Sequence, residues 1–540
     1  MIKLNISQNN EVTKQLDDDI IEFLYQLCKG LDDNVNQYLC GRIEIVHGYA
    51  DAVDFLTSKF QDLYINSSQG AYIRFEDSTV QSKLANAYGD GIGLTTQQAA
   101  SITATNAMRN LFNANTAITS FDELSYFINL REIGYDAFRG CTNLTSIDLR
   151  NVDTLNRHAF NGCTKLTTIK NYQHVTTYEY SVFENCDLFG DYDFSGVNVS
   201  NNNSSNRILG FANNKHITSI IMPQVQYLCS FNNCQSLTSL TGLDSVINVS
   251  SDTFMNCYVL GNLYMPNLEV IGHRVFEYCN AMTIIDLPKL KRCEYNVFNK
   301  NANLVEVNVP LLDTIETGTF SENPKLETVT IGPITKIPSS TFKNCKKLST
   351  LNMDFSLITE INNQAFYCCE SLTSLDFSNN LKTINNEAFK GVSAIEYIST
   401  ETIYPTSIGN YAFSGCSSLK GRIDLSQCTT LNEGVFYGCS SLTSIGSLSP
   451  ELITISAFAF CKTGLTGNLD IPASVVSIGG DSFRYMSALT SLTFNSLTPP
   501  ERTGNTHFNN STYIIYVPAS AVETYKNAWT DVASRIQAKP

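Results

Sequence analysis

The segment INNQAFYCCESLTSLDFS (residues 361–378) returns in altered form along most of this chain of 540 residues. Close relatives are INNEAFKGVSAIEYI at 384–398, IGNYAFSGCSSL at 408–419 and LNEGVFYGCSSLTSI at 431–445. Internal repetition at a fixed period of 20–50 residues is the signature of an array in which each unit stacks on its neighbours. The pair Cys368-Cys369 inside this segment raises the question of whether the array carries chemistry.

Each unit is organised around one phenylalanine. An apolar residue, usually Ile, precedes this Phe by five positions, and an L-x-x-L-x-L pattern such as Leu144-x-x-Ile147-x-Leu149 begins six positions after it. One unit cannot bury its apolar side alone, so stacking is predicted to build continuous columns of Phe and Leu. The Phe positions, mostly 22–24 residues apart, are 138, 160, 183, 211, 231, 254, 276, 298, 320, 342, 366, 389, 413, 436, 460 and 483.

Ten of the 17 cysteines occupy one slot of the repeat, three residues after the Phe: Cys141, Cys163, Cys186, Cys234, Cys257, Cys279, Cys345, Cys369, Cys416 and Cys439. In other units the same slot holds Asn214, Asn301, Asn323, Val392, Thr463 or Met486. A metal site or a disulfide would not tolerate such replacements, whereas a buried cysteine often behaves as a small hydrophobe. We therefore interpret the slot as a packing position and Cys368 as its neighbour.

The units, written I-x-x-x-A-F-x-x-C-x-x-L-T-S-I, resemble the BspA-like leucine-rich repeats. These occur in surface proteins of gut bacteria and protists and in virion proteins of gut bacteriophages. The resemblance covers about residues 113–497, and the segment 498–529 resembles the usual C-terminal closure of such arrays. It implies an α/β repeat solenoid, a leucine-rich-repeat array of about 16 rungs with parallel β-strands on one face. The predicted ladder comprises Phe138, Phe160, Phe276, Phe298, Phe320, Phe366, Phe389, Phe413 and Phe436 with the slot cysteines Cys141, Cys163, Cys279, Cys369, Cys416 and Cys439.

Four regions are expected: a small N-terminal α/β anchor module (1–94), a helical N-cap (95–130), the repeats (131–497) and a cap of one strand and one helix (498–540). In the first region, MIKLNI (1–6), RIEIVHG (42–48) and AYIRFED (71–77) are predicted strands, with a helix at about 50–63. In the last, a strand from Tyr513 to Val517 and a helix begun at Pro518 are predicted. Open solenoid ends require such lids.

The motif NAYGDGIGLTTQQAA (86–100) resembles the loop and helix that often precede such arrays and look like half an EF-hand. Calcium requires several oxygen ligands at fixed loop positions. With Asp90 at position five, the first position is Asn86 and the third is Tyr88, so two charged ligands are missing. We favour a Gly-rich turn that caps a helix from about Thr95 to Phe112.

Composition and motifs argue against catalysis and against nucleic acid. The formal net charge is −15, and phosphate binding requires Lys and Arg. The six histidines are scattered, and the repeats contain no G-x-S-x-G, Walker or dinucleotide motif, so no enzyme, metal or cofactor is predicted. The N-terminus lacks the apolar core of a secretory signal, and no apolar stretch is long enough for a membrane span.

Side chains alternate along a strand, so the third and fifth positions of L-x-x-L-x-L are predicted to point outward. They form a mostly uncharged field of hydroxyls and amides that could bind a glycan or a protein, or could be solvated without any ligand. The possible ligand face comprises Asp148, Lys170, Tyr264, Asp286, Asn308, Thr330, Asn352, Asp376, Tyr397 and Thr493.

Two non-enzymatic hypotheses follow from the resemblance and the layout. In the first, the chain is a virion protein of a gut bacteriophage, assembled in the host cytoplasm and attached to other virion proteins through its N-terminal module. Its repeats then display a surface for a host-surface glycan or protein, and a homo-oligomer such as a trimer fits this role. In the second, it is a BspA-like cell-surface adhesin. An enzyme hidden in the N-terminal module is the third alternative.

Overall fold

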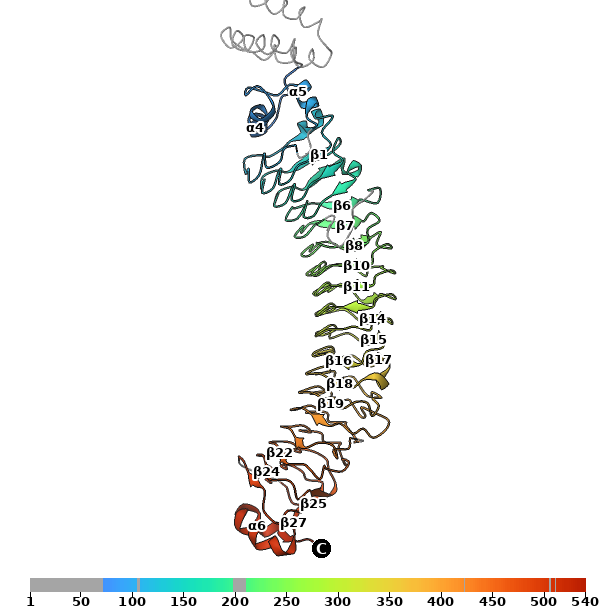
Figure 1. Cartoon of the computed structure of the whole chain (residues 1–540), viewed down its shortest axis with the longest axis vertical. Coiled ribbons are helices and arrows are strands. Elements are labelled where there is room, and N and C mark those ends of the chain that lie inside the picture. The colour runs from blue at the N-terminus through green and yellow to red at the C-terminus, as the bar shows by residue number, and fades with distance from the viewer. Residues whose placement is uncertain (1–70, 104–106, 198–209, 422, 505–506, 510) are drawn as a thin grey trace, which may run out of the picture. The chain divides into compact units, whose positions relative to one another are not determined.

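The computed structural model describes residues 71–103, 107–197, 210–421, 423–504, 507–509 and 511–540 (Figure 1). They fall into two compact units. The larger comprises residues 104–122 and 130–540, and the smaller comprises residues 1–103 and 123–129. The predicted strands at 1–6 and 42–48 and the predicted helix at 50–63 lie outside the described residues.

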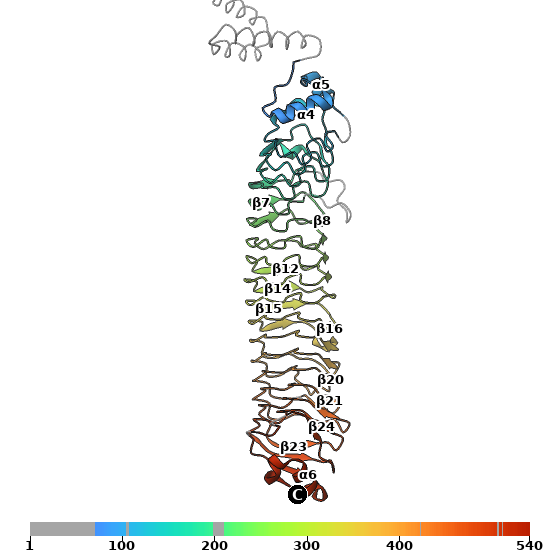
Figure 2. The same cartoon turned by 90° about the vertical axis from the view of Figure 1, so that its left-hand side faces the viewer.

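The larger unit is a solenoid in which most turns contribute a short parallel strand to one or both of two separate columns (Figures 1 and 2). The first column contains the L-x-L strands β2 (Ser146–Asp148), β4 (Thr168–Lys170), β6 (Gly190–Asp193), β7 (Ile217–Ile221), β9 (Ser239–Thr241), β12 (Ile284–Asp286), β14 (Glu306–Val309), β15 (Thr328–Ile331), β17 (Thr350–Asn352), β23 (Gly467–Ile471), β25 (Leu489–Phe494), β27 (Ile514–Val517) and β28 (Ile536–Ala538). Successive strands pair in parallel with matching positions aligned, as in Val307 beside Val329. The predicted parallel-strand solenoid is confirmed.

The second column arises from the apolar residue five positions before each Phe. Its strands are only two residues long: β1 (Glu132–Ile133), β3 (Thr154–Leu155), β5 (Thr177–Tyr178), β8 (Tyr227–Leu228), β10 (Asn248–Val249), β11 (Val270–Ile271), β13 (Arg292–Cys293), β16 (Lys336–Ile337), β18 (Glu360–Ile361), β19 (Thr383–Ile384), β20 (Ser407–Ile408), β21 (Thr430–Leu431), β22 (Thr454–Ile455), β24 (Ser477–Ile478) and β26 (Glu501–Arg502). The sequence predicted the buried Ile but not a second strand column, because two residues leave no recognisable alternation.

The Phe segment of each rung is a tight turn rather than a helix. Around Phe366, both Gln364 (φ 57°) and Cys368 (φ 56°) adopt left-handed backbone conformations, and the same pattern brackets Phe298 and Phe342. Two left-handed residues in five are incompatible with a right-handed helix. The backbone N–H of Phe366 instead donates to the carbonyl oxygen of Ala388 on the next rung (2.8 Å). The repeats therefore contain few helices, among them the 3₁₀ helices η2 (Tyr172–His174) and η3 (Phe355–Leu357).

The Phe rings form the core column. Phe389 stacks between Phe366 (centroids 5.1 Å apart, planes at 5°) and Phe413 (5.3 Å, 4°), and every ring of the predicted ladder is buried. The column also continues beyond the predicted units, to Phe112 on the N-terminal side of Phe138 (5.0 Å) and to Phe508 on the C-terminal side of Phe483 (6.0 Å). Stacked aromatic pairs are favourable by about 0.5–1.5 kcal/mol beyond the apolar area that they bury.

The C-terminal segment closes this column. β27 and β28 extend the first strand column, and η4 (Ala519–Ala521), α6 (Val522–Ala528) and η5 (Thr530–Arg535) follow Pro518. Trp529 is buried against Phe494 (5.0 Å) and Phe508 (5.3 Å). The last rung thus receives an aromatic lid in place of another repeat.

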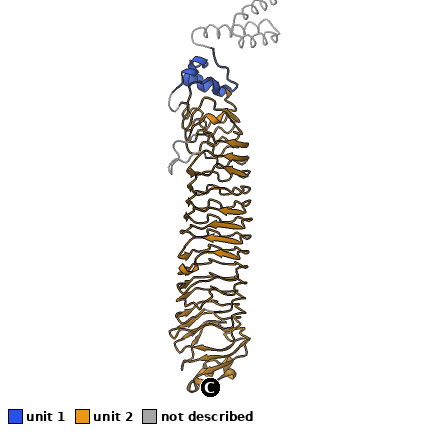
Figure 3. Cartoon of the chain, turned by 90° about the vertical axis from the view of Figure 1, so that its right-hand side faces the viewer, with its two compact units in different colours: residues 1–103, 123–129 blue, residues 104–122, 130–540 orange. Residues whose placement is uncertain are grey.

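In the smaller unit, two short helices follow one another (Figure 3). The carboxylate of Asp77 accepts the N–H groups at the start of α4 (Ser78–Tyr88), and Thr95 with Gln98 forms a capping box on α5 (Thr96–Ser101). Two predictions were wrong: residues 71–77 form a single antiparallel bridge, Tyr72 to Thr95, rather than a strand, and the helix from Thr95 ends at Ser101 rather than Phe112. The 3₁₀ helix η1 (Asp122–Tyr126) lies between α5 and β1 in the sequence. None of the described helices has the length and hydropathy that a bilayer span requires.

Candidate functional site

The cysteine slot is a hydrogen-bonding position. The Sγ of Cys369 donates to the carbonyl oxygen of Phe342 on the preceding rung (3.1 Å), which also accepts the backbone N–H of Cys345 (3.1 Å). The other slot thiols make the same bond at 3.0–3.2 Å: Cys141 to Phe112, Cys163 to Phe138, Cys186 to Phe160, Cys234 to Phe211, Cys257 to Phe231, Cys279 to Phe254, Cys345 to Phe320, Cys416 to Phe389 and Cys439 to Phe413.

Two of the three slot asparagines also donate to the Phe carbonyl of the preceding rung, whereas Asn301 donates to Phe298 O of its own rung (3.0 Å). The side-chain amide of Asn214 reaches Phe183 O (2.7 Å), and that of Asn323 reaches Phe298 O (2.8 Å). The slot therefore holds a buried donor in most units, although Val392 and Met486 fill it without one, so its interpretation as a hydrophobic packing position was incomplete. Burial raises the pKa of the slot thiols, to about 12 for Cys257, so they remain protonated donors.

In the described structure, the slot thiols neither form disulfides nor belong to a group that could hold a metal ion. Within the described part of the chain, the cysteines form no disulfide, and no group of three or more His, Cys, Asp or Glu could hold a metal ion. Cys368 lies outside the buried slot and is partly exposed. The pair Cys368-Cys369 thus consists of one turn residue and one ladder donor.

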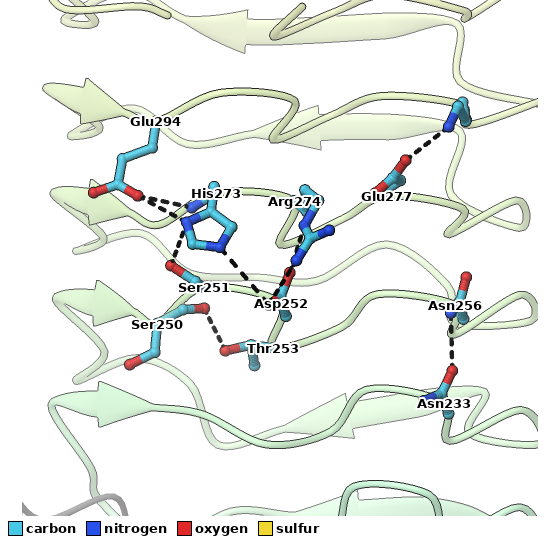
Figure 4. Close-up of polar contacts among 11 residues, drawn as sticks. Asn233, Ser250, Ser251, Asp252, Thr253, Asn256, His273, Arg274, Glu277 and Glu294 are labelled. Atoms are coloured by element: carbon cyan, nitrogen blue, oxygen red, sulfur yellow. Dashed lines mark hydrogen bonds and ion pairs between the residues drawn. The ribbon is translucent and has the colours of Figure 1, made fainter.

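A cluster of titratable side chains that spans three rungs surrounds His273 (Figure 4). Its Nδ1 lies 2.9 Å from Ser251 Oγ and 3.2 Å from Glu294 Oε2, and its Nε2 lies 3.7 Å from Asp252 Oδ2. Arg274 donates two further bonds to Asp252 (2.8 and 3.1 Å).

This arrangement does not activate a nucleophile. Ser251 and Glu294 share Nδ1 of the imidazole. Asp252 lies at the opposite nitrogen, but at 3.7 Å it is beyond hydrogen-bond distance and both of its oxygens accept from Arg274, so it does not orient the ring as the carboxylate of a serine triad does. All these contacts join neighbouring rungs, so the cluster ties the turns after β10, β11 and β13 together. His216 and Asp187 form a separate pair elsewhere, so His216 and His273 do not share a site.

The loop that resembles half an EF-hand is held by hydrogen bonds within its own turn, as the predicted Gly-rich turn requires. Asp90 Oδ1 accepts the backbone N–H groups of Ile92 and Gly93 (both 2.9 Å), and the hydroxyl of Tyr72 donates to Oδ2. The Tyr72 hydroxyl and these N–H groups lower the pKa of Asp90. The carboxylate therefore organises a Gly-rich turn ahead of α5.

The outward side chains of the first strand column define the strand face. Of the predicted ligand-face residues, Lys170, Tyr264, Asp286, Asn352 and Asp376 are exposed and Asn308, Thr330 and Tyr397 are half-buried. Two were placed wrongly: Asp148 is 4% exposed and Thr493 is 2% exposed. Asp148 is covered by Arg150 (Nε to Oδ2, 3.0 Å) and Asn171, and the hydroxyl of Thr493 donates to Asn468 Oδ1 (2.8 Å).

Much of this face is tied by bonds between rungs. Asn308 donates to Asp286 (2.8 Å), and Asn352 donates to the hydroxyl of Thr330 (3.1 Å). Such side-chain ladders hold the polar groups in place before any ligand arrives, which reduces the entropic cost of binding.

The first strand column is interrupted at Tyr264. Between β9 and β12, the rung of residues 261–265 forms no strand. The side-chain oxygen of Asn262 replaces a backbone carbonyl there and accepts the N–H groups of Thr283 (2.9 Å) and Ile284 (3.1 Å). Tyr264 is 71% exposed here, with Ile284 (44%) on the next strand and Ile221 (40%) two rungs before.

We call Ile221, Tyr264 and Ile284 the tyrosine patch. The prediction placed Tyr264 and Ile284 on the outer face but missed Ile221, because the long insertion before Phe211 obscured the register of β7. The alternation of ITSII at 217–221 is the signal that could have found it.

Comparisons with known proteins agree with the repeat architecture. A family model described as BspA type leucine rich repeat region (6 copies) matches residues 105–229, 207–327, 313–422 and 406–529. No significant match to a curated protein was found. Among solved structures, the chain is similar to a leucine-rich repeat protein from Bacteroides ovatus (22% identity, TM-score 0.43, covering 55% of this chain and 82% of that one) and to a leucine rich cell surface protein from Faecalibacterium prausnitzii (20%, 0.32, 58% and 92%).

Proposed function

Because the chain belongs to the BspA-type leucine-rich-repeat family, we propose that it is a non-enzymatic recognition protein whose strand face binds a macromolecule on a host surface. The described solenoid supports this role, since its polar clusters connect neighbouring rungs and none forms a catalytic constellation. A solenoid presents one long continuous surface, which suits extended recognition.

The tyrosine patch is the observation that carries this proposal. Tyr264, at 71% exposed, stands among hydroxyl, amide and carboxylate side chains where the strand column is interrupted between β9 and β12. Tyrosine is enriched among the few residues that dominate binding energy, because it offers a rigid apolar ring with a polar end. An exposed aromatic group rimmed by polar residues is the usual anatomy of a recognition surface.

We further propose that the face is displayed on a bacteriophage virion, attached to other virion proteins through residues 1–94 and assembled in the host cytoplasm. The unbridged cysteines of the described repeats support this, because a reducing compartment keeps thiols from pairing. A trimer would multiply weak contacts with a host-surface protein or glycan. The alternative is display on a cell as an adhesin.

Recognition is tested by binding the labelled full chain to candidate host cells. Tyr264→Ala should weaken binding about tenfold or more, since truncating a central tyrosine removes a dominant contact. Tyr485→Ala is the matched control, because that tyrosine is 40% exposed but lies on a Phe-segment turn outside the strand face. Equal loss in both variants, or no loss in either, would contradict the proposed face.

Display is tested by mass spectrometry of purified particles, in which the chain should be found together with capsid and tail proteins. A variant that lacks residues 1–94 should be lost from particles. Recovery of the chain on a cell envelope and not in particles would support the adhesin alternative instead.

A further inference from the structure

Resting on the proposed function, we infer that the tyrosine patch binds a basic segment of a protein that places an apolar side chain beside Tyr264. The inference depends on the side chains that surround the patch and on their register in the strand column. The surrounding side chains and their register indicate whether the partner is a protein or a glycan, and whether its charge is basic or acidic.

The apolar part of the patch favours a protein. Ile221 (40% exposed) and Ile284 (44%) offer no donor or acceptor to a sugar hydroxyl, but both gain from burial against an apolar side chain. Tyr264 lies between them along the column and adds a rigid ring with a polar hydroxyl. Together they form an anchor that a leucine or isoleucine of a partner can cover.

The register of the strands places a carboxylate beside each exposed isoleucine. Ile221 on β7 pairs with Asp193 on β6, and Ile284 on β12 pairs with Glu306 on β14. Asp286, two residues after Ile284 on the same side of β12, adds a further carboxylate. The apolar anchor is therefore flanked by negative charge at both ends.

No positive charge balances these groups on the same surface. The outward positions described from β6 to β17 contain neither Lys nor Arg: Asp191, Asp193, Ser219, Ile221, Ser239, Thr241, Asn262, Tyr264, Ile284, Asp286, Glu306, Asn308, Thr328, Thr330, Thr350 and Asn352. Lys or Arg of a partner would meet complementary potential here, whereas an acidic protein or a sialylated or sulfated glycan would be repelled.

The experiment uses the full chain and short synthetic peptides in which leucine alternates with lysine, glutamate or serine. Fluorescence anisotropy should show tightest binding of the leucine–lysine peptide. Tyr264→Ala should weaken its binding about tenfold or more at every salt concentration. Asp286→Asn with Glu306→Gln should weaken it about tenfold at low salt and flatten its salt dependence, since it removes charges but keeps shape.

The matched control is Asp313→Asn with Glu451→Gln, which removes the same charge from exposed positions just before the second strand column, outside the strand face, and should leave binding unchanged. Equal binding of all three peptides, or equal loss in the control, would overturn the inference. If a neutral glycan binds through Tyr264 and no peptide does, the result supports the proposed recognition role but contradicts the inferred basic protein partner. If Tyr264→Ala changes neither peptide nor cell binding, both fail.

Discussion

The thiol of Cys369 donates a hydrogen bond to the carbonyl oxygen of Phe342, 27 residues earlier in the chain and one rung away in space (3.1 Å). The carbonyl has two lone pairs, and the backbone N–H of Cys345 uses the other. The slot thus couples the Phe column of one rung to that of the next, in a region from which water is excluded.

Replacement of Cys369 should separate hydrogen bonding from volume. Cys369→Ala loses the donor and leaves a small void, so we expect the free energy of unfolding to fall by about 1–2 kcal/mol. Cys369→Val refills the volume without a donor and should recover only part of this loss. Urea denaturation measures both variants, and full recovery in the valine variant would show that the slot requires volume alone.

The thiols should also differ in reactivity. Burial raises the pKa of Cys369 well above its usual range, and that of Cys345 to about 12, so neither forms the reactive thiolate near neutral pH. Cys368 is partly exposed. In a Cys28→Ser, Cys40→Ser background, a thiol reagent should modify Cys368 first in the native protein and the remaining thiols only after denaturation.

Cys368→Ser is the control for this assay and should remove the early phase. Rapid modification of many thiols in the native protein would contradict a column that excludes solvent.

The sequence predicted the Phe column because an aromatic residue that recurs at a nearly constant period occupies the same position in every turn of a stacked array. It did not predict the Cys369–Phe342 bond, since the donor and acceptor belong to different repeats. A signal was present nonetheless: Asn214 and Asn323 occupy the same slot, and a hydrophobic position does not accept a buried amide without an acceptor. The burial of Asp148 was not predicted, because it depends on Arg150, which follows the strand and covers the carboxylate.

Left-handed turns beside each Phe give a prediction about glycine. Gly415 has φ +77°, and a Cβ added there would meet no atom closer than 3.6 Å, so Gly415→Ala tests backbone conformation rather than space. We expect a loss of about 1–2 kcal/mol in the free energy of unfolding, the cost of a left-handed conformation for a residue with a Cβ. Asn256→Gly, at φ +64°, is the reverse control: it relieves the left-handed strain but removes the hydrogen bond that the Asn256 amide donates to Asn233 (2.8 Å), so it should be close to neutral. A fall in stability for this control would indicate that the Asn side chain matters more than the backbone.

Asp148 should make the stability of the protein depend on pH. Burial alone raises the pKa of Asp148, but the hydrogen bonds from Arg150 and Asn171 outweigh it and hold the pKa below the ordinary value of 3.8. A carboxyl whose pKa is lower in the folded state stabilises that state fully above its unfolded pKa, and the contribution disappears as the pH falls through the folded value.

Asp148→Asn should therefore be less stable than the native chain at pH 7, and the difference should shrink as the pH is lowered below about 3.8. Asp286→Asn, at an exposed position on the same face, should show a smaller difference at pH 7. If the Asp148→Asn difference stayed constant from neutral to strongly acidic pH, the ion pair would not be its cause, and packing around the strand end would have to explain it.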